Sequence, residues 1–317
     1  MDYKNKYMKY KTKYLNLKNM NINNQTGGGA IKKILYDNGN FLVENNIDND
    51  KLDKNTTFLI GSITKIFTVY MILILQQNNL LNINDNISKY IKSKNKNNDD
   101  IFRKITILDI INHTSGLKSL PNKKKIIYTK HNNASLCMKT FINEDLFIHT
   151  FGTDNYSNIG YIILGYVIEK ITKLTYIDAY KKYIFNPIGM TNTDIGEPKI
   201  KLYSENCKKI KKDEHKFKYF GLSAGGLYSC VNDLLLFANK SFGLLNNDMQ
   251  NILINKIYIG KMNNQRGNIG HSGKIYGSHC RFYFTLNDNK LEKIYIEFNT
   301  CISIKKEIDE YYKLVNI

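Results

Sequence analysis

The 317-residue sequence has no tryptophan, only three prolines and no long apolar segment. Its longest apolar run, residues 66–75, is interrupted by Thr68. Such a run is too short to cross a membrane and indicates a buried core helix. The N-terminus has basic residues but no uninterrupted apolar stretch, which argues against a secretory signal peptide. We therefore expect no transmembrane segment and an intracellular or particle-associated location.

Cysteine is also scarce. The five cysteines are odd in number and widely separated, and no two have the C-x-x-C spacing of a zinc or redox motif. They are Cys137, Cys207, Cys230, Cys280 and Cys301. We expect reduced thiols, as in intracellular proteins, with no disulfide framework and no metal site.

Acidic residues are outnumbered, 28 against 46 Lys and Arg, which gives a formal net charge of +18. This balance favours anionic partners such as nucleic acid, whose binding would weaken steeply as salt rises. However, Asn, Ile and Lys are used heavily throughout the chain. Lysines on solvated faces are therefore the simpler explanation for most of the charge.

Residues 1–26 differ in pattern from the rest of the chain. Lysines surround a seam in which apolar side chains recur at alternating spacings of four and three, which is typical of an amphipathic helix. The seam consists of Tyr3, Tyr7, Tyr10, Tyr14 and Leu17. Three glycines, residues 27–29, follow as a flexible joint. The segment could dock on an acidic partner, pack on the domain or form a disordered leader.

Strand patterns occur at both ends of the remaining sequence and helical patterns between them. Asn38-Gly39 between two short apolar stretches predicts a hairpin. We expect helices at 62–90, 105–112, 156–183, 232–239 and 304–315, strands at 270–274, 280–286 and 293–299, and loops near 93–100 and 121–133. This order predicts an α+β fold, with an antiparallel sheet flanked by helices and a separate helical lobe.

A first chemical motif is the S-x-x-K sequence formed by Ser62 and Lys65 at the start of an apolar helix. Residues three apart share a helix face, so the Lys65 amine can reach the Ser62 hydroxyl. A serine is a weak nucleophile unless a neighbouring base removes its proton. Lys65 can be that base only if its environment lowers its pKa.

Two further motifs lie far along the chain. Tyr156-Ser157-Asn158 combines a phenol that can relay a proton with an amide that can hold a substrate, although Ser157 or Asn158 could simply cap a helix. His271-Ser272-Gly273 places an imidazole on a glycine-bounded strand. Glycine there allows close approach of a ligand, although a lone histidine is often structural.

Taken together, the three motifs resemble those of the serine β-lactamase and penicillin-binding protein family. Members carry S-x-x-K, Y-x-N and then K-T-G or its H-x-G variant, in this order. The resemblance is strongest to class C β-lactamases, D-alanyl-D-alanine carboxypeptidases and related esterases. Longer segments, including "ITILDIINHTSGL" and "GLSAGGLYSCVNDLLLFA", resemble the family's scaffold, and the resemblance covers most of residues 30–300.

This resemblance implies a β-lactamase/transpeptidase-like domain. We expect residues 1–29 to form the basic leader and glycine linker, and residues 30–317 to form the catalytic domain. Its sheet lobe would comprise residues 30–58 and 200–317, and its helical lobe residues 59–199.

The resemblance also implies roles. Ser62 would form an acyl-enzyme, Lys65 would assist its deprotonation and Tyr156 would serve as acid and base. Asn158 would hold the substrate amide, and the backbone N–H groups of Ser62 and Lys274 would form an oxyanion hole, with no cofactor or metal. His271, Ser272, Gly273 and Lys274 would line the substrate's edge of the sheet.

Several departures leave the substrate open. His271 replaces the family's usual permanent cation, Lys274 brings a long side chain where a small one is expected, and the tyrosine–lysine segment replaces the usual N-terminal helix. The substrate could be a β-lactam, a D-amino-acid peptide or an ester, and a catalytically silent binding protein is the remaining alternative. Ser115, beside His113, is rejected as a rival nucleophile because no orienting acid accompanies the pair.

Overall fold

The computed structural model describes residues 32–45, 51–119, 133–147, 152, 155–199, 221–258, 268–275, 278–287 and 290–300. The expected leader and the expected helix at 304–315 lie outside these residues. Among the residues described, none of the helices combines the length and apolarity that a membrane crossing needs.

The strands are β1 (Lys32–Asp37), β2 (Asn40–Asn45), β3 (Phe58–Leu59), β4 (Asp194–Ile195), β5 (Leu227–Ser229), β6 (Asn268–Ile275), β7 (Ser278–Asn287) and β8 (Lys290–Thr300). The α-helices are α2 (Thr64–Gln77), α3 (Lys96–Phe102), α4 (Ile107–Ile111), α5 (Ala134–Phe141), α6 (Asn158–Thr172), α7 (Tyr176–Tyr180), α8 (Asn186–Ile188), α9 (Val231–Lys240) and α10 (Asn247–Lys256). Short 3-10 turns are η1 (Gly61–Ile63), η2 (Ile87–Lys89), η6 (Leu222–Ala224) and η7 (Ser241–Leu244), and η4 (Lys181–Phe185) is a π-helical segment.

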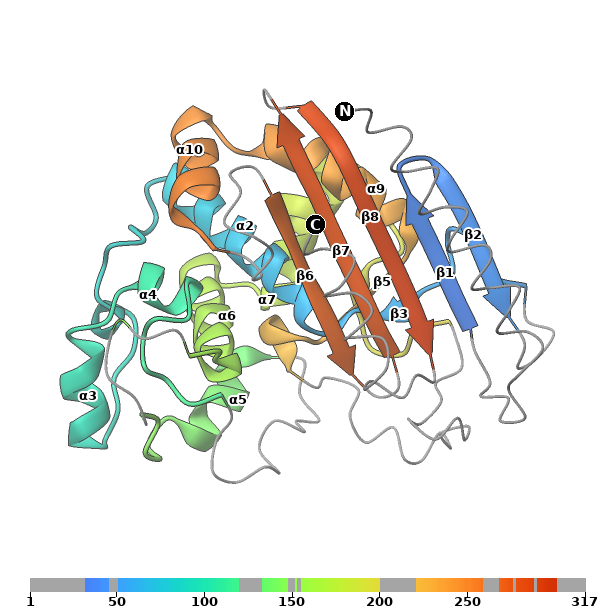
Figure 1. Ribbon diagram of the computed structural model, residues 1–317. Coiled ribbons are helices and arrows are strands. Elements are labelled where there is room, and N and C mark those ends of the chain that lie inside the picture. Colours follow the sequence, from blue (N-terminus) through green and yellow to red (C-terminus); the bar gives the residue numbers. More distant parts are fainter. Residues whose placement is uncertain are drawn as a thin grey trace.

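The main sheet is antiparallel, with strand order β2-β1-β8-β7-β6. One face buries alternate residues such as Phe282, Ile296 and Phe298, as expected for a sheet with one face on the core. Figure 1 shows this sheet in front of α2 and α9, with α3, α4, α5 and α6 to one side. A second, three-stranded sheet has the order β3-β5-β4. The predicted α+β fold, an antiparallel sheet with flanking helices and a helical lobe, is confirmed.

The predicted hairpin is also confirmed. Asn38 and Gly39 connect β1 to β2 and both have positive φ, 44° and 97°. These two residue types tolerate that conformation, which matches the twist of the flanking strands. Asn38 further accepts a hydrogen bond from the Ile294 N–H at 3.0 Å, which ties the turn to β8.

The central helix α2 is buried from Thr64 to Leu75. It ends at Gln77, so the prediction of helix to residue 90 is wrong. Asn79 adopts a left-handed conformation with φ of 57°, and the Leu80 N–H donates back to the Leu75 carbonyl at 3.0 Å. This closing pattern satisfies the carbonyls of the last turn and stops the helix.

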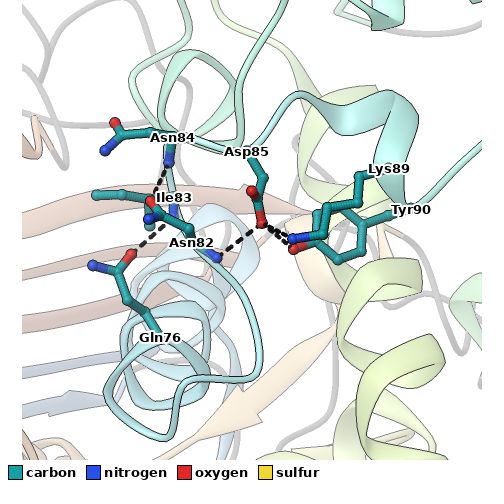
Figure 2. Close-up of polar contacts among 7 residues, drawn as sticks. All are labelled: Gln76, Asn82, Ile83, Asn84, Asp85, Lys89 and Tyr90. Carbon is teal, nitrogen blue, oxygen red and sulfur yellow. Dashed lines mark hydrogen bonds and ion pairs between the residues drawn. The ribbon is translucent and has the colours of Figure 1, made fainter.

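After α2, hydrogen bonds from side chains hold the following segment of the chain in a turn (Figure 2). Gln76 accepts from the Ile83 N–H at 2.8 Å. The Asp85 carboxylate accepts from the Asn82 N–H at 3.0 Å and from the Lys89 amine at 2.8 Å. Local side-chain hydrogen bonds of this kind compete with helix formation. The apolar pattern does not reveal them, so it predicted a helix longer than α2.

Capping residues divide the other helices. Ser157 caps α6, and Lys173, with φ of 60°, ends it. Thr175 then caps a new helix, α7, so the single helix expected at 156–183 is wrong. Within 105–112 the helix is the shorter α4, which Thr106 caps.

Other helices were missed. The loop expected near 93–100 contains the start of α3, which Asn95 caps. Neither α5 nor α10 was anticipated. Both begin at asparagine caps, Asn133 and Asn246, a signal that the abundance of asparagine obscured.

Candidate active site

Three segments far apart in the sequence bring an alcohol, an amine and a phenol together. Ser62 lies in η1 at the start of α2, Lys65 lies in the first turn of α2, and Tyr156 precedes α6. The Ser62 Oγ lies 2.5 Å from the Tyr156 hydroxyl and 3.1 Å from the Lys65 Nζ. The hydroxyl of Ser62 is therefore within hydrogen-bonding reach of two groups that can exchange protons.

Lys65 is fully buried and is surrounded by neutral acceptors. Its Nζ donates to Asn158 Oδ1 at 2.7 Å and to the Ala224 carbonyl at 2.6 Å, in addition to its contact with Ser62. The same amine lies 4.8 Å from the ring centre of Tyr156 and 5.4 Å from that of Tyr161. Burial lowers the pKa of Lys65 well below its ordinary value.

The partners of Lys65 determine what its neutral form can do. A neutral amine has two N–H groups and one lone pair, while Asn158 Oδ1 and the Ala224 carbonyl can only accept. If these two take both N–H groups, the lone pair faces the Ser62 hydroxyl. Ser62 then donates to Lys65, and Tyr156 must donate to Ser62. The geometry thus allows proton movement along Tyr156, Ser62 and Lys65.

Tyr156 is held at the beginning of α6 with 38% of its surface exposed. Burial raises the pKa of Tyr156 to about 12, while the hydrogen bond with Ser62 opposes the shift. The phenol therefore stays protonated at neutral pH. The next residue, Ser157, caps α6 by accepting from the Gly160 N–H at 3.0 Å. The helix-cap interpretation and the site interpretation of this motif are compatible, because alternate residues serve the two purposes.

Strand β6 lies directly against the turn that carries Ser62. A Cβ added at Gly273 would come within 1.9 Å of the Ile60 carbonyl and 3.2 Å of the Ser62 nitrogen. One added at Gly61 would come within 2.9 Å of the Lys274 nitrogen. Two glycines therefore permit the contact that brings the backbone nitrogens of Ser62 and Lys274 to the same edge of the site.

The remaining residues expected in the site lie on strand β6. The His271 ring centre lies 6.0 Å from that of Tyr156, and its Nδ1 contacts the Ser272 carbonyl. Burial and the Lys65 charge lower the pKa of His271 to about 4, although the contact with Ser272 opposes this shift. The Ser272 and Lys274 side chains are exposed, so it is the backbone of Lys274 that lies beside the turn carrying Ser62.

Residues 30–291 match the family model described as Beta-lactamase. The chain belongs to the β-lactamase family. This match confirms the family and the fold that the three motifs predicted. Members of this family are serine hydrolases.

Individual similarities agree with this assignment. Protein flp of Staphylococcus aureus strain N315 is 33% identical over 148 residues, 45% of this chain, but the alignment spans only 29% of flp. A D-stereospecific amidohydrolase from Streptomyces sp. superposes with a TM-score of 0.66 at 20% identity, covering 87% of this chain and 90% of that one. A class C β-lactamase mutant gives a TM-score of 0.68 at 18% identity, covering 98% and 97%. At such identities the structural matches show the fold alone.

Two members of the site in this β-lactamase-family chain were missed from the sequence. Tyr161 follows Asn158 by three residues, and that spacing could have placed its ring on the same face of α6. The Ala224 carbonyl gave no signal, because any residue supplies one. Only the fold brings Ala224, at the end of η6, to the amine of Lys65.

Other candidate chemistry is excluded or lacking where the structure describes the chain. Ser115 is 1% exposed, so a substrate cannot reach its hydroxyl, in agreement with its rejection as a nucleophile. Across the described ranges, no group of three or more His, Cys, Asp or Glu side chains is placed to hold a metal ion.

Proposed function

We propose that this protein is a serine hydrolase that acts through an acyl-enzyme on Ser62, opening a β-lactam or cleaving a related D-amino-acid peptide. The observation that carries the proposal is the contact of the Ser62 hydroxyl with both the buried Lys65 amine and the Tyr156 phenol. A nucleophile beside a base of lowered pKa is the arrangement that covalent catalysis by serine requires.

Acylation begins when neutral Lys65 takes the Ser62 proton as the oxygen attacks the substrate carbonyl. The developing oxyanion is stabilised by the backbone N–H groups of Ser62 and Lys274, and a donor of this kind contributes about 3 kcal/mol in other hydrolases. Tyr156 then donates its proton to the leaving nitrogen or oxygen. The protonated Lys65, whose amine lies 4.8 Å from the Tyr156 ring centre, then gives the proton that it accepted to the Tyr156 phenolate, which restores both groups.

Deacylation uses the same groups in the reverse direction. A water molecule attacks the acyl-Ser62 carbonyl as Tyr156 gives its own proton to neutral Lys65 and takes one from the water. Lys65 then passes the proton it received to the leaving Ser62 oxygen, which restores all three groups. Asn158, held by the Lys65 amine, orients the substrate amide. The rate of this second stage distinguishes a β-lactamase from a penicillin-binding protein.

An esterase is the second candidate, and His271 favours it. A permanent cation at this position would attract a substrate carboxylate, whereas His271 is neutral above a pKa of about 4. An uncharged ester or amide needs no cation in the site, so it could bind beside the neutral His271 without losing a charge interaction. The similarity in fold to a D-stereospecific amidohydrolase and a class C β-lactamase supports acyl transfer in either case.

The test is intact-mass measurement of the full chain after incubation with a penicillin or with a p-nitrophenyl ester. We expect a covalent adduct on the parent and none on Ser62→Ala. A long-lived penicillin adduct would indicate penicillin-binding behaviour, a short-lived one with turnover a β-lactamase, and turnover of the ester alone an esterase. If neither these reagents nor a D-alanyl-D-alanine peptide gives an adduct or product, the proposal fails and the silent binding protein is favoured.

A further inference from the structure

The turn after α4 contains a residue in an unusual backbone conformation. His113 has φ of 61°, in the left-handed region that residues other than glycine rarely adopt. Its N–H donates to the Ile110 carbonyl at 3.2 Å, which places it just beyond the helix end. Glycine is the usual residue at such a position. The contacts of the His113 side chain explain why histidine, and not glycine, occupies this position.

His113 makes hydrogen bonds to both chain neighbours of Tyr156. Its carbonyl accepts from the Asn155 N–H at 2.8 Å. Its Nδ1 accepts from the Ser157 N–H at 3.1 Å. Because a backbone N–H can only donate, Nδ1 must be unprotonated, and the proton of the neutral ring must be on Nε2. One residue therefore fixes the backbone on each side of the phenol.

The His113 ring also lies against the tyrosines that surround the Lys65 amine. Its centre is 4.6 Å from the Tyr156 ring and 5.2 Å from the Tyr161 ring, with both pairs tilted at 38°. The Lys65 amine lies over the same two tyrosine rings, at 4.8 and 5.4 Å. The His113 ring therefore packs against the Tyr156 ring and limits the space in which that ring can turn.

We propose that His113 is a positioning residue that aims the Tyr156 phenol at Ser62, as a neutral imidazole that accepts through Nδ1. It acts on the proposed chemistry through Tyr156, whose ring and chain neighbours it contacts. The role rests on the proposed function only in its kinetic consequence, since the tautomer and the hydrogen bond are properties of the resting protein. It gives a purpose to His113 in "HTSGL", the segment in which Ser115 is buried and cannot serve as a nucleophile.

Three substitutions separate the contributions of ring and acceptor. His113→Ala removes the ring and the acceptor, and His113→Phe keeps a ring without an acceptor. His113→Asn keeps an acceptor without the ring, and asparagine tolerates the left-handed backbone conformation. Misplacement of a reacting group by about 1 Å can lower a rate about 100-fold. For acylation by a p-nitrophenyl ester, we expect His113→Ala and His113→Phe to lower kcat about tenfold or more with KM changed less than about twofold. His113→Asn should recover most of the loss.

Lys173→Ala is the matched control, because Lys173 has nearly the same φ, 60°, but is exposed at the end of α6. It should keep the parent kcat. Nitrogen-15 correlation spectra of the full chain, with its six histidines, should show His113 protonated on Nε2. A His113 ring protonated on Nδ1 would overturn the inference. So would a kcat for His113→Asn no higher than that of His113→Ala, when both variants are folded. Absence of any turnover by the parent would instead refute the proposed function, while the spectra would still decide the tautomer.

Discussion

At the scale of single residues, the decisive feature is a buried amine that is held, among the described residues, by neutral groups. Lys65 has no exposed surface, and its three hydrogen-bond acceptors are a hydroxyl, an amide oxygen and a backbone carbonyl. Burial penalises the charged form, and these neutral groups compensate it less than a carboxylate would. The sequence alone could indicate that Lys65 faces Ser62, but it could not show that the described acceptors of the amine are neutral groups.

The pH dependence of acylation should therefore follow Lys65. Protonated Lys65 cannot accept the Ser62 proton, so the rate should rise with pH through the lowered pKa of Lys65 and stay level until Tyr156 ionises at about 12. Stopped-flow acylation between pH 5 and about 10 measures this limb. A rise centred near the ordinary lysine pKa of about 10.4 would contradict it.

The same shift must appear in stability. Between the lowered pKa of Lys65 and its unfolded value, the unfolded chain holds a proton that the folded chain lacks, so the free energy of unfolding rises with pH. Relative to Lys65→Met, the parent should gain thermal stability through this window. Melting temperatures of the two chains across the window check the sign.

His271 determines the charge offered to a substrate. Because its pKa is lowered to about 4, the site presents a neutral imidazole at pH 7. His271→Lys should add a cation and increase acylation by carboxylate-bearing penicillins relative to neutral esters, by about tenfold for about 1.4 kcal/mol of added attraction. The ratio of the two kcat/KM values measures it. A ratio unchanged by the substitution would mean that this position does not contact the carboxylate.

At the scale of elements, the site depends on the contact between β6 and η1. Gly273 leaves no room for a side chain, because a Cβ would lie 1.9 Å from the Ile60 carbonyl. Backbone cannot move aside as a flexible side chain can. Any residue larger than glycine must therefore separate the strand from the turn that carries Ser62.

Gly273→Ala should accordingly lose both activity and stability. We expect about 1–3 kcal/mol less stability, as for other overpacked sites, and a larger fall in acylation rate because the N–H groups of Ser62 and Lys274 move apart. Gly243→Ala is the control, since a Cβ there meets no atom within 4 Å. It should change stability by about 0.5 kcal/mol or less. Denaturant unfolding and acylation kinetics on both variants provide the comparison, and equal behaviour would contradict the packing argument.

Elements defined by local signals were predictable, and elements defined by distant contacts were not. The Asn38-Gly39 hairpin and the apolar strands of the main sheet followed from short patterns. The break between α6 and α7 and the start of α5 have local caps, but both are also held by Glu169, which is buried. It accepts from the N–H groups of Ala134 at 2.8 Å and Tyr176 at 3.2 Å. A carboxylate that caps two helices, one of them 35 residues away, leaves no local pattern.

At the scale of the whole molecule, the lysine-rich N-terminal pattern and the family match occupy different parts of the sequence. The family match begins at residue 30, directly after the three glycines, whereas the lysine-rich pattern of residues 1–26 precedes it. The residues that meet around Ser62 all lie within the matched range. Acylation should therefore not require the leader, whereas any binding to an acidic partner should require it.

Deletion of residues 1–29 tests this division. The shortened chain should fold and acylate at a rate within about twofold of the parent, because it keeps Lys65 and Tyr156, the groups seen to contact the Ser62 hydroxyl among the described residues. Its binding to an anionic polymer such as heparin should weaken and depend less on salt, because fewer lysines release counterions. Salt-gradient retention and acylation rates of both chains measure the two effects. Unchanged retention would show that the +18 charge acts through the body of the domain, and lost acylation would show that the leader supports the catalytic fold.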